Sequence, residues 1–334
     1  MLPIISRPTL CLLTCLALPA FAHANDTTTS DTDSPNLEPE NNTWLDDTRD
    51  DTKGWLNRTA RHMDSWFGET NPDEPARASI RVMLDTHYNE YDGTTVKPRI
   101  RGRIKLPTLE NRLSVMIGDD DLDLEQGGGI YNDGRAVTYG DSTFDRRQSR
   151  EDNTSLALRW SKFQDDIGIE TDADIGLRSS DLYLKLRAEK KWELDHRINA
   201  RFEQMYRYGT KSEHYALSTL EFSQPQSKHR TLVNRTHLSY AHKDTEETAW
   251  SNSLYQQHYL DGKHGTRAFS YGIYTGGDVV DKKFELDIYG PYVSYRQPVW
   301  RKWLFVQTDI SYYNDKNQDR DHHLGVFNRL EMVF

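Results

Sequence analysis

The sequence is almost free of cysteine. Its two cysteines, Cys11 and Cys15, lie close to the start, so the chain beyond them can form no disulfide. An exported protein without disulfides must be stabilised by another route, such as a sufficient core or a closed sheet in lipid.

Long apolar runs are also missing. After residue 24 no stretch approaches the roughly 18 consecutive apolar residues that a membrane helix needs, and the mean hydropathy is -0.84. This average by itself suggests a soluble protein. It does not exclude a membrane barrel, because strands that alternate lipid-facing and lumen-facing residues are hydrophilic on average.

No basic patch dominates the chain. Of the 52 acidic residues 13 lie in 25–75, against 4 of the 42 basic ones, so the acidity is concentrated near the start and the remainder is close to neutral. Nucleic acid is therefore not an expected partner.

The first residues resemble a processing signal. Arg7, an apolar run from Leu10 to Phe21 and the small-x-small site ending at Ala24 predict a secretory signal over residues 1–24. A lipoprotein signal ending at Cys15 is the alternative interpretation. Residues 25–42 are polar, acidic and without periodicity, which predicts a disordered linker.

A helical segment is predicted next, over 43–75, with the helix itself in 43–68. Trp44, Trp55 and Trp66 are spaced by eleven residues, which is almost three helical turns, so they share one helix face. Gly54 predicts a kink or two shorter helices. We expect an amphipathic helix that packs on the periplasmic rim or lies on the inner leaflet, with a partner-binding or plugging helix as the alternative.

From about residue 76 the hydrophobic period changes to two. Apolar residues such as Ile80, Val82 and Leu84 alternate with polar ones, as expected for strands with one apolar face. Fourteen strands are predicted, with 12 or 16 as alternatives, over 77–91, 96–106, 110–119, 151–163, 166–178, 180–191, 195–209, 212–223, 229–242, 246–260, 264–276, 282–298, 301–314 and 322–334.

A soluble sandwich would show the same alternation, so other features must decide. The strand number is even, the turns on one side are short, and the one long loop, 120–150, lies on the other side. Aromatic residues form two groups, as at two membrane interfaces. The predicted periplasmic group is Trp160, Phe163, Trp192, Phe222, Trp300 and Trp303, and the predicted outer group is Tyr88, Tyr91, Tyr206, Tyr208, Tyr240, Tyr274, Tyr312 and Tyr313. The predicted fold class for 76–334 is an all-β transmembrane antiparallel β-barrel.

The C-terminus carries a resemblance. Phe334 is the last residue and follows Val326, Leu330 and Met332 at alternate positions, although Asn328 departs from the pattern. This end resembles the terminal strand of Gram-negative outer-membrane β-barrels. The resemblance covers 76–334 as architecture and identifies no subfamily. It implies an outer-membrane location, recognition of Phe334 by the barrel assembly machinery, and contact with outer-membrane lipids and lipopolysaccharide.

Charged residues alternate along several strands. A basic track at Arg99, Arg101, Arg103 and Lys105, joined by Arg112, would cost about 2–4 kcal/mol per residue at the bilayer midplane, so it must face the lumen. An acidic track at Glu170, Asp172 and Asp174 faces it, and inward positions are also predicted for Arg197, Arg201 and Glu203. These charges either neutralise one another or form a track for anionic solutes.

Two functions therefore lead. We expect a porin-like channel for small polar or anionic solutes, similar in strategy to the arginine tracks of oligogalacturonate-specific porins. The alternative is a non-conducting structural or scaffold barrel that binds a periplasmic protein through residues 43–68.

A surface hydrolase is the third hypothesis. Asp85 and His87 share a face on the first strand, as do His237 and Ser239 on the ninth, with Asn252 on the tenth. Such pairs occur by chance in a chain of this length, so no catalytic residue is assigned. No cofactor or metal is expected, since the acidic loop 119–125 lacks the glycine of an EF-hand loop.

Overall fold

The computed structural model describes residues 43–66, 75–109, 112–118, 128–130, 136–139, 155–162, 168–178, 181–242 and 246–334. The predicted signal, the predicted linker, Phe163 and the acidic loop 119–125 lie outside these ranges. Within them, one α-helix precedes a large antiparallel sheet.

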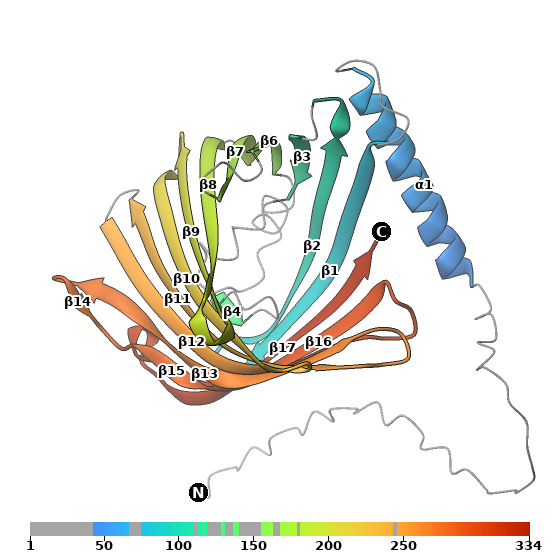
Figure 1. Cartoon of the computed structure of the whole chain (residues 1–334). Helices are drawn as coiled ribbons and strands as arrows, with labels where there is room; N and C mark the ends of the chain where they lie inside the picture. The colour runs from blue at the N-terminus through green and yellow to red at the C-terminus, as the bar shows by residue number, and fades with distance from the viewer. Residues whose placement is uncertain are drawn as a thin grey trace, which may run out of the picture. The chain divides into compact units, whose positions relative to one another are not determined.

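The sheet closes on itself as a ring of fourteen strands, which confirms the predicted number (Figure 1). Closure is made by β1 pairing with β17 and by β12 pairing with β13. The strands of the ring are β1 (Arg77–Asn89), β2 (Gly93–Leu106), β3 (Leu113–Ile117), β6 (Leu156–Lys162), β7 (Ile169–Arg178), β8 (Asp181–Leu194), β9 (Ile198–Gly209), β10 (Glu213–Ser227), β11 (Arg230–His242), β12 (Glu246–Leu260), β13 (Arg267–Val280), β15 (Ile288–Pro298), β16 (Leu304–Asp315) and β17 (Arg320–Val333).

The remaining elements are short. β4 (Gly128–Ile130) and β5 (Ala136–Tyr139) form a separate two-stranded sheet, and β14 (Lys283–Phe284) pairs with the end of β13. Single turns of 3-10 helix occur at η1 (Pro107–Leu109), η2 (Asp195–Arg197) and η3 (Lys316–Gln318).

Two predicted boundaries are wrong. Arg197 lies in the turn η2 with a φ of 58°, so it is not an inward residue of a strand. The predicted strand over 282–298 begins only at Ile288, because Asp281 and Lys282 both adopt positive φ in the turn between β13 and β14. Positive φ at both central residues is the geometry of a tight hairpin, which extends β13 to Val280.

The two faces of the ring differ in chemistry. On β8, Leu182, Leu184 and Leu186 are each about half exposed, whereas Tyr183 and Lys185 between them are almost fully buried. The apolar residues therefore point outward and the polar residues inward. A closed ring satisfies every strand edge, so such a sheet with an apolar outer wall can span a bilayer.

The outer wall carries aromatic residues at both ends. Exposed tryptophans and a phenylalanine lie near the rim that bears both ends of the ring, hereafter the periplasmic rim. We call this set the periplasmic girdle, and its members are Trp160, Trp192, Phe222 and Trp300. Exposed tyrosines lie near the opposite rim: Tyr88, Tyr91, Tyr206, Tyr208 and Tyr312.

Two tyrosines predicted for the outer girdle face the other way. Tyr274 and Tyr313 are buried on the inner wall, and the neighbouring Ile273 is the exposed, outward residue. The inner face of β13 consists of residues such as Ser270 and Gly272, so polarity does not distinguish the two faces there.

The helix α1 (Trp44–Asp64) begins after Thr43, whose backbone N–H and hydroxyl both donate to the Asp46 carboxylate at the third helical position. It continues through Gly54 without interruption, so the predicted kink is wrong. A Cβ at Gly54 would meet only the Arg58 side chain, and helix docking offsets the weak helix propensity of glycine, about 1 kcal/mol.

α1 packs on the outer wall, at the periplasmic rim beside β1 and β2 (Figure 1). Leu56 and Ala60 are buried against Ala78, Ile104 and Leu106, whose side chains point outward from the ring. Trp44 and Trp55 lie in the helix and Trp66 lies two residues beyond its end, and all three are exposed. Among the described residues no helix is long and apolar enough to cross a membrane.

Candidate functional site

The basic track lies on the inner wall of β2. Arg99, Arg101, Arg103 and Lys105 alternate there with outward residues such as Ile100 and Ile104. Arg112 immediately precedes β3, and its carbonyl accepts a hydrogen bond from the backbone of Ser161. We call Arg99, Arg101, Arg103 and Lys105 the basic row.

More cations lie directly opposite the basic row. In the register of β1 with β2, Arg101 faces Arg81 and Lys105 faces Arg77. Like charges placed directly opposite one another across two strands destabilise a sheet. The pairing of β1 with β2 therefore concentrates positive charge on one part of the inner wall, toward the periplasmic rim.

The two ends of the basic row have different partners. Arg99 Nε lies 2.9 Å from the fully buried Asp85, which also accepts two hydrogen bonds of 2.6 Å from Arg329. Further toward the periplasmic rim, Arg101 donates to the Ile100 carbonyl, and Arg103 donates to Ser114 Oγ over 3.2 Å. Among the described contacts of the row, the carboxylate at ion-pair distance is at the Arg99 end, and Arg103 contacts a hydroxyl group.

Three cations at the periplasmic mouth, Arg77, Arg103 and Lys105, form what we call the mouth cluster. Within the part of the chain that the structure describes, none of the three forms an ion pair with a carboxylate. Arg77 and Lys105 are exposed and Arg103 is half-buried. Arg81 differs from them, because Glu331 lies 3.9 Å from its guanidinium.

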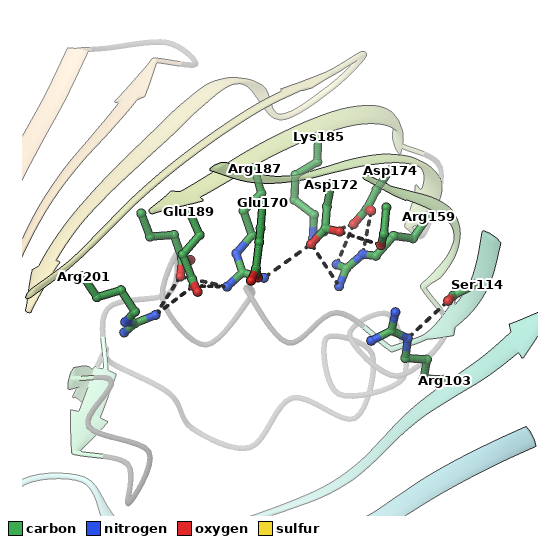
Figure 2. A network of polar contacts seen from close by, with 12 residues as sticks. Arg103, Ser114, Arg159, Glu170, Asp172, Asp174, Lys185, Arg187, Glu189 and Arg201 are labelled. Atoms are coloured by element: carbon green, nitrogen blue, oxygen red, sulfur yellow. Dashed lines mark hydrogen bonds and ion pairs between the residues drawn. The ribbon is translucent and has the colours of Figure 1, made fainter. Parts of the chain in front are cut away.

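The acidic track lies on β7 and is neutralised locally. Asp174 is almost fully buried and accepts hydrogen bonds of 2.7 and 2.8 Å from Arg159, while Lys185 Nζ lies 3.1 Å away. Asp172 accepts a hydrogen bond from Ser161 and lies 3.4 Å from Arg187. The bases at ion-pair distance from this track come from the adjacent strands β6 and β8 (Figure 2), while Arg103 of the basic row attracts Asp172 and Asp174 from a longer distance.

Glu170 departs from the other two acids of the track. Its side chain is 49% exposed, and Lys191 Nζ lies 4.0 Å from it. It is therefore the member of the acidic track that solvent can reach most easily.

The alternation of charge continues beyond β8 (Figure 2). Arg187 donates to Glu189 over 3.0 Å and to Glu203 over 2.8 Å, and Arg201 donates to the same two carboxylates. Glu221 connects Arg201 with Arg235. The exposed Lys191 lies 2.6 Å from Glu189 and links Glu170 to this set. We call the remaining, less exposed members the charge ladder: Arg159, Asp172, Asp174, Lys185, Arg187, Glu189, Arg201, Glu203, Glu221 and Arg235.

Part of the charge ladder was predicted from the sequence. Asp172, Asp174, Arg201 and Glu203 were expected on the inner wall, and alternation with leucine and alanine places Lys185, Arg187 and Glu189 on the polar face of their strand. Arg159, Glu221 and Arg235 were not singled out.

A third part of the inner wall, on β12 to β16, is rich in hydroxyl groups, and its charged residues include Arg296, which pairs with Glu331, and the buried Asp309. Its tyrosines Tyr255, Tyr274, Tyr292 and Tyr313 form one buried cluster with Val233. Ser253 and Tyr292 share a hydrogen bond of 2.8 Å between their hydroxyls. Close packing requires small neighbours here, since a Cβ at Gly272 would lie 2.6 Å from the Tyr255 Cβ.

The first hydrolase candidate has no available carboxylate. Asp85 is fully buried between the Arg99 and Arg329 guanidinium groups, so its oxygens are engaged in ion pairs. General acid–base chemistry needs a carboxylate or histidine that can reach a reacting proton.

The second hydrolase candidate is divided between two faces of the sheet. His237 lies inside and shares a hydrogen bond with Thr219, whereas Asn252 lies outside and bonds with Asn234 and Thr236. Ser239 donates to the Ala249 carbonyl. The arrangement of Ser239, His237 and Asn252 expected of a hydrolase is therefore not formed.

Comparisons with known proteins found similarity in fold and none in sequence family. Neither a protein-family model nor a curated protein sequence matches the chain. The structure is similar to the NanC porin, with a TM-score of 0.37 and 6% identity over 75% of this chain and 98% of that one. It is also similar to OprB of Pseudomonas putida at high pH, with a TM-score of 0.46 and 8% identity over 78% and 94% of the two chains.

An outer-membrane protein of Vibrio cholerae, OmpT, gives a TM-score of 0.44 and 7% identity over 80% of this chain and 99% of that one. These similarities are of fold. The assignment rests on the chain's own closed ring of fourteen strands, its apolar outer wall and its two sets of exposed aromatic residues. The protein is an outer-membrane β-barrel.

Proposed function

We propose that the protein is a porin-like channel that passes small anionic solutes. The observation that carries this proposal is the mouth cluster, in which Arg77 and Lys105 face one another and Arg103 meets a hydroxyl group. Like charges in register destabilise a sheet unless something offsets them. An anionic solute in the lumen would offset the repulsion between these cations. A purely structural role for the cluster would leave that repulsion without compensation.

The charge ladder supports the same proposal by its neutrality. Its arginines and lysine alternate with aspartates and glutamates at ion-pair distance, so their fields largely cancel. The net field inside this barrel therefore comes from the wall formed by β1 and β2. Rings or rows of Arg and Lys are the arrangement that anion-selective pores use.

Efflux from proteoliposomes tests the proposal. Purified protein is reconstituted with a small organic anion or an organic cation of the same size trapped inside, and the two efflux rates are compared. We expect faster efflux of the anion. The double variant Arg103→Glu with Lys105→Glu should abolish or reverse this preference, because it replaces two cations of the mouth cluster.

A matched control carries the same change in net charge outside the lumen. Lys228 and Lys282 are exposed residues of hairpin turns, and Lys228→Glu with Lys282→Glu should leave the anion preference unchanged. Efflux of both solutes at the rate of protein-free liposomes would overturn the channel proposal. An equal loss of preference in the control would show that the mouth cluster has no special role.

A non-conducting scaffold barrel is the second candidate function. It is favoured by the extent of the charge ladder, which ties together strands from β6 to β11, and by the helix fixed at the rim. Folded protein that conducts no solute but retains a periplasmic protein on affinity purification, and loses it when residues 43–66 are deleted, would support this candidate.

A further inference from the structure

The helix α1 is fixed to the barrel at both of its ends. Near its start, Asp46 accepts hydrogen bonds of 2.8 to 3.1 Å from Arg301, which lies in the turn between β15 and β16. At its end, Asp64 accepts a bond of 3.1 Å from the Thr108 N–H in the turn between β2 and β3. The helix therefore follows the periplasmic rim from one turn to the other, across the seam between β17 and β1.

The outer wall beneath the helix combines large apolar side chains with two alanines. Ala76 and Ala78 are buried there, and Ala60 of the helix is fully buried against them. Phe334 also packs into this contact. A wall built to face lipid would gain from larger apolar residues, so these alanines indicate a surface shaped to accept a helix.

The periplasmic girdle is interrupted at the same place. Trp300 lies just before the turn that holds Asp46, and Trp160 lies opposite Leu113 at the other side of the helix. Between them, Trp303 lies in the turn between β15 and β16, with the Arg49 guanidinium of α1 5.6 Å from its ring. Among the described outward residues of β17, β1, β2 and β3 near this rim, Phe334 is the only aromatic, and it packs against the contact that α1 makes. The exposed Trp44 and Trp55 of α1, and the exposed Trp66 two residues beyond its end, lie across this gap.

The rotation of the helix indicates where these tryptophans point. At about 100° per residue, Leu56 and Met63 lie about 90° round the helix from Asp46 and Asp64. The tryptophans lie about 90° further in the same direction. These directions divide the helix surface into four sectors of about 90°, which we call quarters: the aspartate quarter, the wall quarter, the tryptophan quarter and the charged quarter. The charged quarter carries Asp47, Asp51, Arg58 and Arg61.

The contacts of two quarters fix the orientation. The aspartate quarter touches the periplasmic turns, and the quarter of Leu56 and Met63 touches the outer wall, where Ile80 lies further along β1 into the membrane-spanning part. A further rotation of about 90° around the helix axis, in the same direction, points away from the periplasm. The tryptophan quarter is therefore turned toward the bilayer, and the charged quarter, opposite the wall quarter, is turned away from the barrel.

We propose that Trp44, Trp55 and Trp66 insert into the phospholipid headgroup region of the inner leaflet and complete the periplasmic girdle across the seam. Tryptophan favours this region because its ring is amphipathic. Thr48, Thr59 and His62 lie beside the tryptophans, with the His62 ring edge-on to Trp66 at 5.4 Å, and no lysine or arginine lies on this face; Asp51 lies at its edge, about 40° from Trp55. The proposal is independent of what the lumen transports.

Spin labels can test this proposal, because the chain from residue 25 onward has no native cysteine. One label is attached at Trp55→Cys, and a matched control is attached at Arg58→Cys on the charged quarter. The protein is reconstituted in phospholipid vesicles. Collision of each label with oxygen, which concentrates in lipid, is compared with collision with a water-soluble nickel complex.

We expect the ratio of oxygen to nickel collisions to be several-fold higher at position 55 than at position 58. Thr59→Cys on the tryptophan side gives a second site if the first variant fails to fold, and heat-dependent mobility on gels verifies the barrel. Equal nickel access at positions 55 and 58 would overturn the proposal. Protection of position 55 from both reagents would also overturn it. Protection in vesicles of purified protein would mean that a second copy covers this face, and protection in cell envelopes alone would mean that a periplasmic protein covers it.

Discussion

Two parts of the inner wall carry similar numbers of cations and treat them differently. On β6 to β11, Arg187 contacts two glutamates and Arg201 three, and the charge ladder is neutral within itself. On β1 and β2, Arg77 and Lys105 face one another. A buried charge is tolerated when it is paired. The difference shows that cations in one barrel can serve either cohesion or an electrostatic field, depending on their partners.

The largest expected effect is on stability and belongs to the charge ladder. Asp174→Ala should lower the free energy of unfolding by about 3–5 kcal/mol, because it leaves Arg159 and Lys185 buried without their shared carboxylate. Chemical unfolding in detergent micelles measures this loss. Glu170→Ala on the same strand is the control, and its exposed side chain should make the change smaller than about 0.5 kcal/mol. Equal losses would contradict the contrast.

An isolated ion pair at the periplasmic rim gives a second test. Hydrogen bonds from Arg301 hold the pKa of Asp46 well below its usual range. A lowered folded-state pKa contributes docking stability that is present above the usual carboxyl pKa of about 3.9 and is lost as pH falls through the lowered value.

We therefore expect α1 to stay docked at neutral pH and to become susceptible to pepsin only well below about pH 4. The variant Asp46→Asn should be cut faster by proteases at neutral pH and should show a weaker acid transition. Unchanged protection of wild-type α1 at every pH would contradict a role for this carboxylate.

A smaller effect is expected at the opposite rim. Arg320 on β17 donates two hydrogen bonds, of 2.7 and 2.8 Å, to Asp92 in the turn after β1, and these bonds lower the pKa of Asp92. Asp92→Asn should cost at most about 1 kcal/mol of unfolding free energy, as is usual for one ion pair near the surface. Thermal unfolding measures it. A loss as large as that of Asp174→Ala would mean that isolated pairs and networks are equivalent.

The smallest expected effect is on solute preference when the ladder loses charges in pairs. Arg201→Gln with Glu203→Gln removes one base and one acid that contact each other. Because their fields already cancel, the anion preference measured by efflux should stay within experimental error of the wild type. A shift comparable to that of Arg103→Glu with Lys105→Glu would place the field in the ladder instead.

The sequence was most informative where each strand has one clearly apolar face. Leu182, Leu184 and Leu186 fix the faces of β8, so the inward position of the residues between them could be predicted. The rule fails on β13, where serine and glycine line the lumen, and Tyr274 was assigned to the wrong wall. Polarity cannot separate two faces that are both nearly uncharged.

The residue pairs that form across the sheet could not be predicted from local sequence patterns. Alternation predicts that Asp174 faces inward, but only the register of β6 with β7 places it opposite Arg159. Asp46 and Arg301 are 255 residues apart, and no periodicity in the sequence connects them. The helix was therefore predictable, whereas its anchors were not.

The reversal potential of the purified wild-type protein in a planar bilayer, under a gradient of potassium chloride, tests the central claim most directly. If the mouth cluster sets the field of the lumen, steady conductance should appear and the reversal potential should have the sign of chloride selectivity. A complete absence of conductance, or a reversal potential with the sign of potassium selectivity, would contradict this account.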